Sequence, residues 1–203
     1  MQYDELRQTL QELLASRERL RIHDEGLSPA AVLLLLYPRA DEYHVLLTQR
    51  TSRVEHHKGE VSLPGGAWDH GETLAETALR EAREEVGLEP SLVELLGTLD
   101  DITTRSNFVV TPHIGITRST VEFAHSEHEV AALLEIPVRA FYDPAVHVAA
   151  ADVEFAGRVV PGGHFRWGEA IVFGVTYRIL RQFLDLVEPL DFWRLDPQVD
   201  RPR

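Results

Sequence analysis

The sequence predicts an α/β fold of the α+β kind, a layered domain in which strands and helices are mixed without regular alternation. The chain has 203 residues, of which 44% are hydrophobic, and this is enough to build a substantial core. Short apolar runs bounded by turn residues recur as in strands, and three segments carry a helical repeat of apolar residues. Because domains usually hold about 100–200 residues, we expect one domain over residues 1–203, with residues 1–28 as an N-terminal helical extension.

Residues 2–21 have the pattern of an amphipathic helix. Its apolar positions recur near helical spacing at Leu6, Leu10, Leu13, Leu14 and Leu20. The following Gly26, Ser28 and Pro29 predict that the helix has ended before the first strand begins.

Short apolar runs predict the first strands. Val32–Tyr37 and Tyr43–Thr48 are separated by the turn sequence PRADE, so we expect two strands joined by a turn. A loop rich in arginine and histidine follows, and then Val61–Leu63 and the turn sequence PGG.

Residues 73–86 form the clearest predicted helix in the chain. Thr73 is followed three residues later by Glu76, which is the pattern of a capping box at a helix N-terminus. Gly87 stands where a C-terminal glycine ends many helices.

The second half of the chain has weaker patterns. Leu92–Leu99 and Phe108–Thr117 are typical of strands, and Glu127–Leu134 reads as helical or irregular. Val153–Val160 and His164–Trp167 flank a second PGG, so we expect a hairpin that turns there. Residues 168–187 end in a predicted helix.

Composition restricts the possible functions. The 33 acidic against 20 basic residues give a net charge of −13, which argues against binding to nucleic acid or to an anionic membrane. The longest apolar run, Ala30–Tyr37, is far below the roughly 20 residues that span a bilayer, and the N-terminus lacks a signal peptide's apolar stretch. We therefore expect a cytoplasmic protein that acts on a small molecule; a homodimer is left open.

The absence of cysteine excludes disulfides, thiolate metal sites and a cysteine nucleophile. Three carboxylates offer a different chemistry: Glu81, Glu84 and Glu85 stand at i, i+3 and i+4 and form one patch that borders the buried stripe of the helix. Such charges repel unless a cation lies between them, and oxygen ligands suit Mg²⁺ or Mn²⁺. The alternative is a solvated surface helix in which Arg80 and Arg83 pair with the glutamates.

Residues 66–88 resemble the signature of the Nudix hydrolases, G-x5-E-x7-R-E-U-x-E-E-x-G-U, where U is aliphatic. The match covers all the fixed positions, namely Gly66, Glu72, Arg80, Glu81, Glu84, Glu85 and Gly87. The resemblance implies an α/β/α sandwich around a mixed sheet, with the N-terminal helix as an addition. It also implies an enzyme that cleaves a nucleoside diphosphate linked to another group, with Mg²⁺ or Mn²⁺ as cofactor.

The resemblance assigns roles within this segment. Glu81, Glu84 and Glu85 would hold the metal, and Arg80 would pair with a carboxylate, for which Glu72 is the best candidate. Gly66 and Gly87 are expected at permissive backbone positions. A water attacks phosphorus, and its general base is either a signature glutamate or one from a distant loop. The loop candidates are Glu127 and Glu129.

The preceding segment, Leu46–Gly66, resembles the additional motif of the coenzyme A pyrophosphatase branch. That motif reads approximately L-L-T-x-R-[SA]-x3-R-x3-[GA]-x-[VI]-x-F-P-G-G, and this chain departs from it at Thr51, Glu55 and Leu63. Glu55 reverses a charge. The implied reaction converts coenzyme A or its thioesters to adenosine 3′,5′-bisphosphate and 4′-phosphopantetheine.

A net-acidic protein must concentrate positive charge where an anionic substrate binds. The candidate substrate contacts in this segment are Arg50, Arg53, Lys58, Gly65 and Gly66. Two other functions stay open: a Nudix hydrolase for ADP-ribose or another nucleoside diphosphate derivative, which Glu55 favours, and a non-catalytic nucleotide-binding regulatory module. An intact trio of carboxylates counts against the module, because a sensor has no need of three repelling charges.

Overall fold

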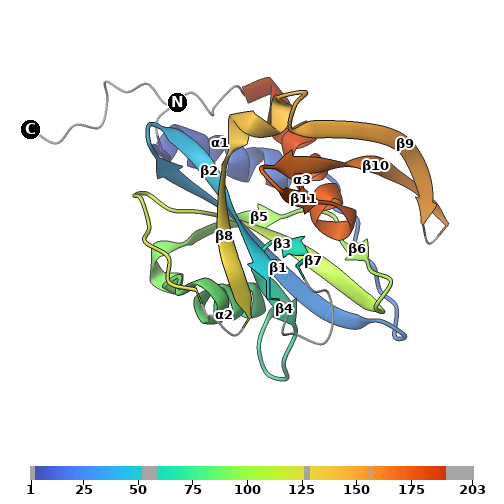
Figure 1. Ribbon diagram of the computed structural model, residues 1–203. Coiled ribbons are helices and arrows are strands. Elements are labelled where there is room, and N and C mark those ends of the chain that lie inside the picture. The colour runs from blue at the N-terminus through green and yellow to red at the C-terminus, as the bar shows by residue number, and fades with distance from the viewer. Residues whose placement is uncertain (1–2, 52–58, 126–128, 156, 191–203) are drawn as a thin grey trace, which may run out of the picture.

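The computed structural model describes residues 3–51, 59–125, 129–155 and 157–190 (Figure 1). Its α-helices are α1 (Tyr3–Ser16), α2 (Leu74–Val86) and α3 (Gly174–Val187), and short 3-10 turns cover Pro90–Leu92, Val138–Tyr142 and Glu188–Leu190. The main sheet contains β1 (Ser28–Arg39), β2 (Glu42–Arg50), β3 (Val61–Ser62), β4 (Gly65–Ala67), β5 (Glu94–Thr98), β6 (Ile102–Thr103), β7 (Phe108–Ile116) and β8 (Val130–Pro137). A second sheet contains β9 (His147–Phe155), β10 (Arg158–Trp167) and β11 (Ala170–Val172).

Strand β1 is the centre of the main sheet. It pairs in parallel with β7 and antiparallel with β2 and β4, so the sheet is mixed. Its apolar residues are buried on both faces, because Leu33 and Leu35 belong to one core cluster while Leu34 and Leu36 belong to the other. This unbroken apolar run is typical of a strand that is covered on both sides.

Helices cover both faces of this sheet, as Figure 1 shows. On one face, Ala78, Ala82 and Val86 of α2 pack against Leu33 and Leu35. The other face packs against α1 and α3, together with the second sheet. The predicted α/β/α sandwich with a mixed sheet and an N-terminal helix is therefore confirmed. Among the described residues, no helix is both long and apolar enough to cross a membrane.

The N-terminal helix is shorter than predicted. It ends at Ser16 instead of residue 21, because the next residues are bound to the turn between β5 and β6. Arg17 pairs with Asp100, and Arg19 pairs with Asp101. Helix α1 itself contacts β5, on the sheet face opposite α2.

The prediction of a helical or irregular segment over Glu127–Leu134 is wrong from residue 130 onward. Val130–Pro137 is strand β8, and it pairs antiparallel with β2 over most of that strand's length. Pairing with a distant strand has overridden a local pattern that carries no clear period of two. Glu127 lies outside the described residues.

The predicted hairpin exists, but its turn lies elsewhere. Val153 and Val160, which we expected on one strand, are partners on the neighbouring strands β9 and β10. The chain reverses between Phe155 and Arg158, and the PGG sequence lies within β10 at a bulge. Gly162 is required there by close packing, because a Cβ would lie 2.0 Å from the Ala151 carbonyl oxygen.

Asp101 gives a test of how the N-terminal segment is held. Its carboxylate is buried and accepts hydrogen bonds from the Ile22 backbone N–H at 3.0 Å and the Thr111 hydroxyl at 2.7 Å, besides pairing with Arg19. Asp101→Asn removes the charge and turns one acceptor oxygen into a donor, so we expect unfolding in urea to show a loss of about 1–3 kcal/mol. Asp152→Asn, at an exposed position of β9, is the control and should change stability little. Equal losses in both variants would contradict this account.

Candidate active site

The site is built on the segment that leads from β4 into α2. Thr73 caps the helix: its hydroxyl accepts a hydrogen bond from the Glu76 backbone N–H at 3.2 Å, and the Glu76 carboxylate accepts one from the Thr73 backbone N–H at 2.7 Å. At the other end, Gly87 has a left-handed φ of 67° and ends the helix. The predicted capping box and C-terminal glycine are both confirmed.

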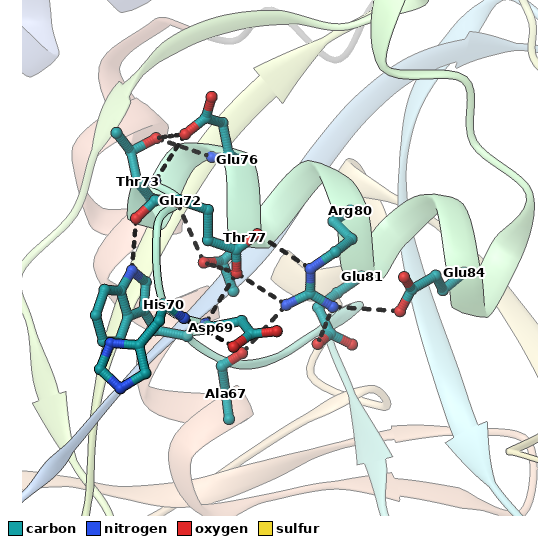
Figure 2. A network of polar contacts seen from close by, with 11 residues as sticks. Ala67, Asp69, His70, Glu72, Thr73, Glu76, Thr77, Arg80, Glu81 and Glu84 are labelled. Atoms are coloured by element: carbon teal, nitrogen blue, oxygen red, sulfur yellow. Dashed lines mark hydrogen bonds and ion pairs between the residues drawn. The ribbon is translucent and has the colours of Figure 1, made fainter.

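Arg80 connects the loop before α2 to the helix, and Figure 2 shows it at the centre of a polar network. Its Nε donates to Glu72 at 3.1 Å and its Nη2 donates to the same carboxylate at 2.9 Å. The predicted pairing of these two residues is confirmed. The Arg80 guanidinium, helped by the Thr77 hydroxyl at 2.7 Å, lowers the pKa of Glu72 to about 2. Glu72 therefore stays ionised across the neutral range.

Arg80 also contacts two carboxylates of the predicted metal-binding trio. Its Nη1 donates to Glu81 at 2.8 Å and to Glu84 at 3.2 Å, while its Nη2 reaches the Ala67 carbonyl oxygen at 3.3 Å. One guanidinium thus holds β4, the loop and α2 in register. Glu84 is exposed, whereas Glu81 is largely covered.

Glu85 is the most buried carboxylate of the trio, with 5% of its surface exposed. It accepts a hydrogen bond from the Gly65 backbone N–H, yet its Oε2 is buried and has no hydrogen-bond partner among the described residues. Burial, followed by the nearby charge of Glu81, raises the pKa of Glu85 to about 8. Burial also raises the pKa of Glu81, against the opposing effect of Arg80.

Two residues distant in sequence lie close to these carboxylates. The negative charge of Glu129, just before β8, raises the pKa of both Glu81 and Glu85. The positive charge of Arg50, at the end of β2, lowers the pKa of Glu85. Both strand ends are joined where the Thr51 backbone N–H donates to the Glu129 carbonyl oxygen at 3.0 Å. The predicted substrate contacts Arg53 and Lys58 lie outside the described residues, as does Glu55.

The glycines of the PGG turn are required by close packing. A Cβ on Gly66 would lie 2.5 Å from Glu81 Oε1, and a Cβ on Gly65 would lie 2.3 Å from the Ala31 carbonyl oxygen. Gly65 also has a φ of 156°. Glycine is thus needed at position 66 because the Glu81 carboxylate lies against it. The sequence predicts a different reason, namely the backbone freedom of glycine.

Sequence reasoning missed Thr77. This buried residue donates its hydroxyl to Glu72 at 2.7 Å and so helps to fix the partner of Arg80. Its position four residues before Glu81, on the same face of the helix, was the available signal.

The arrangement fits a divalent cation by its charge and its donor atoms. Glu81, Glu85 and Glu129 bring negative charge together, and the unpartnered Glu85 Oε2 is a hard oxygen ligand of the kind that such ions prefer. Within the described residues, no three Asp, Glu or His side chains lie close enough together to coordinate one metal ion. Glu81 and Glu84 are instead engaged by Arg80.

Comparison with known proteins decides the family. The model of the NUDIX domain matches residues 27–153, which is more than half of the chain. The chain belongs to the Nudix family. Membership confirms the expected Nudix hydrolase, a class of enzyme that cleaves diphosphate anhydrides with the help of divalent cations.

Named relatives agree with this Nudix assignment. NudL of Citrobacter koseri, described as an uncharacterised Nudix hydrolase, is 40% identical over 135 residues, which cover 64% of this chain and 70% of the relative. NudL of Escherichia coli is 34% identical over 198 residues and covers 90% of this chain and 95% of the relative.

Among solved structures, the Nudix hydrolase RenU from M. smegmatis has a TM-score of 0.57 at 19% identity, covering 88% of this chain and 92% of that one. A MutT/nudix family protein from Enterococcus faecalis has a TM-score of 0.50 at 16% identity, covering 93% and 75%. At these identities, the likeness shows the fold alone.

The buried carboxylate predicts a pH dependence of stability in the metal-free Nudix protein. An exposed glutamate in the unfolded chain titrates near a pKa of about 4.3, so between that value and about 8 the folded state binds more protons than the unfolded state. Stability therefore falls as the pH rises through this window. Glu85→Gln mimics the protonated carboxyl, and we expect it to exceed the wild type by on the order of 4 kcal/mol at pH 8 and by only about 1 kcal/mol at pH 5.

Urea unfolding in EDTA at both pH values measures this difference. Glu89→Gln, at an exposed glutamate just after α2, is the matched control and should show no such dependence. A Glu85→Gln effect that is the same at both pH values would show that the carboxylate is ionised in the folded protein throughout.

Proposed function

We propose that this Nudix protein hydrolyses the diphosphate bond of coenzyme A or its thioesters, with Mg²⁺ or Mn²⁺ as cofactor. One observation carries the proposal: the two sequence motifs converge on a single carboxylate. Glu85 of the Nudix signature accepts a hydrogen bond from Gly65 and experiences the charge of Arg50, and both of these residues belong to the coenzyme A-type motif. A segment that distinguishes substrates would need to lie beside the reacting group in this way.

In the proposed enzyme, Glu81, Glu84 and Glu85 hold the cation. When bound, the cation would offset the charge that develops on the diphosphate oxygens during cleavage. Arg80 orients two of these ligands, because it forms ion pairs with Glu81 and Glu84. Its own position is fixed by the ion pair with Glu72. It is a positioning residue in this proposal.

Arg50 is the described residue best suited to contact the diphosphate. Its Nε is buried and makes no hydrogen bond within the described part of the chain, and its charge acts on Glu85. A guanidinium can donate two parallel hydrogen bonds to a phosphate group. Arg53 and Lys58 stay candidate contacts on the evidence of the sequence.

For the general base we propose Glu129, although a signature glutamate is the alternative. Its exposed carboxylate lies within electrostatic reach of Glu81 and Glu85 and can take the proton of the attacking water. A cytoplasmic location, a homodimer and a single domain over residues 1–203 stay predictions from the sequence.

A panel of substrates tests the function. Purified protein is incubated with Mg²⁺ or Mn²⁺ and with coenzyme A, ADP-ribose, NADH and deoxynucleoside triphosphates, and the products are separated by chromatography. We expect coenzyme A to be hydrolysed with the highest kcat/KM, yielding adenosine 3′,5′-bisphosphate. Preferred turnover of ADP-ribose would support the second candidate function, a Nudix hydrolase for ADP-ribose or another nucleoside diphosphate derivative. The reversed charge at Glu55 favours that candidate. Binding without turnover of any member would indicate a regulatory module.

Glu85→Gln tests the metal-binding role. The substitution preserves the shape of the side chain but removes the charge that would attract a cation, so we expect kcat to fall by about a hundredfold or more. Circular dichroism should show an intact fold. Glu89→Gln again serves as the control and should retain its activity, whereas turnover like that of the wild type in Glu85→Gln would refute the assignment.

A further inference from the structure

A pocket of about 630 Å³ lies between the main sheet and the second sheet. It is bounded by β3, by the turn after β6, by the β9–β10 hairpin and by the start of α3, elements that Figure 1 shows on one side of the molecule. Its walls are mainly apolar and include Val61, Leu63, Val110 and Phe155. The volume is within the range of roughly 300–1,000 Å³ that is typical of small-molecule sites.

This pocket and the candidate active site are joined by a short stretch of backbone. Leu63 lines the pocket, and two residues later the Gly65 N–H donates to Glu85. Val32, which also lines the pocket, is the β1 partner of Gly65. Leu63–Gly65 thus runs from the pocket to the carboxylates, and a substrate held at both places would follow this segment.

Arg178 gives the pocket a positive charge. It is half-buried, its Nη2 donates to the Thr103 carbonyl oxygen at 3.1 Å, and its guanidinium carbon lies 5.0 Å from the centre of the Phe155 ring. Burial lowers the pKa of Arg178. No ion pair between described residues involves Arg178, although the acidic residue Glu60 also lines the pocket.

An arginine inside an apolar pocket is costly unless an anion compensates its charge. Arg181, one helical turn after Arg178, has such an anion in Asp185. Arg178 has no such partner among the described residues. Exposed Arg105 adds a second positive charge to the lining of the pocket. The combination of apolar walls, an aromatic ring and arginines matches a flat, apolar group that carries an anion.

The two halves of coenzyme A differ in whether they combine a flat ring with an anionic group. The pantetheine arm has no charge beyond the diphosphate, whereas the adenosine half joins a flat purine to a 3′-phosphate. We infer that the pocket binds the adenosine half of the substrate, with adenine against the apolar wall beside Phe155 and the 3′-phosphate on Arg178. This inference rests on the proposed function and makes the 3′-phosphate the feature that identifies the substrate.

Activity on matched substrates tests the inference. We expect kcat/KM for coenzyme A to exceed that for 3′-dephospho-coenzyme A by about tenfold or more, because the loss of a charge-assisted hydrogen bond to phosphate has an effect of this size. Arg178→Gln should abolish this preference by lowering only the value for coenzyme A. Arg178→Lys should retain part of it, and Arg181→Gln, outside the lining, is the matched control and should retain all of it. A preference that survives in Arg178→Gln would overturn the assignment.

Binding without metal separates this inference from the proposed function. Calorimetry in EDTA compares adenosine 3′,5′-bisphosphate with adenosine 5′-monophosphate for the wild type and for Arg178→Gln. We expect the wild type to bind the bisphosphate about tenfold or more tightly and the variant to bind both alike. If coenzyme A is not hydrolysed but this pattern appears, the pocket assignment stands and the proposed function fails. Equal affinities in the wild type would overturn the pocket assignment even if coenzyme A is hydrolysed.

Discussion

The site depends on the ion pair between Arg80 and Glu72. Glu72 belongs to the loop before α2, and Arg80 belongs to the helix, so their two hydrogen bonds fix the loop relative to the helix. The same guanidinium also donates to Glu81 and Glu84, and its positive charge reduces the repulsion between these two carboxylates. A metal that binds at this site would have to compete with Arg80 for these oxygens. The arginine therefore holds Glu81 and Glu84 in place through these contacts.

Packing of α2 and pairing of β4 on strand β1 hold this arrangement in place. Ala78, Ala82 and Val86 fix α2 against the apolar face of β1, while β4 pairs with the same strand and places Gly66 directly against Glu81. Because both β4 and α2 are anchored on β1, Glu81 is held close to Gly66. The buried Glu85 is a local cost to stability, and the packing of the helix on the sheet offsets it.

The parts of the structure that the sequence predicts well are those set by local chemistry. The helix over residues 73–86 follows from the reciprocal bonds of Thr73 and Glu76 and from the backbone freedom of Gly87, all within a few residues of one another. The pairing of Arg80 with Glu72 also follows from their short separation. In contrast, β8 is set by pairing with the distant strand β2, which no local pattern records. The reversal between Phe155 and Arg158 is local, and Gly157, which has a φ of 72°, was the available signal for it. The approach of Glu129 to Glu85 depends on the pairing of β8 with β2, and so the sequence could offer it only as one loop candidate among others.

Net charge gives a further constraint on where an anionic substrate can bind. In a chain with 33 acidic and 20 basic residues, an arginine readily finds a carboxylate, as Arg17, Arg19 and Arg39 do. A partly buried guanidinium that forms no ion pair within the described residues is therefore informative, because an anionic ligand would compensate its charge. Within the described residues, Arg178 in the pocket is of this kind, and Arg50 beside Glu85 has a buried Nε without a hydrogen bond. The segment Leu63–Gly66 runs between the two places. Two anionic groups on one small molecule, a diphosphate and a second phosphate, would match this pair of positions better than a substrate with a diphosphate alone.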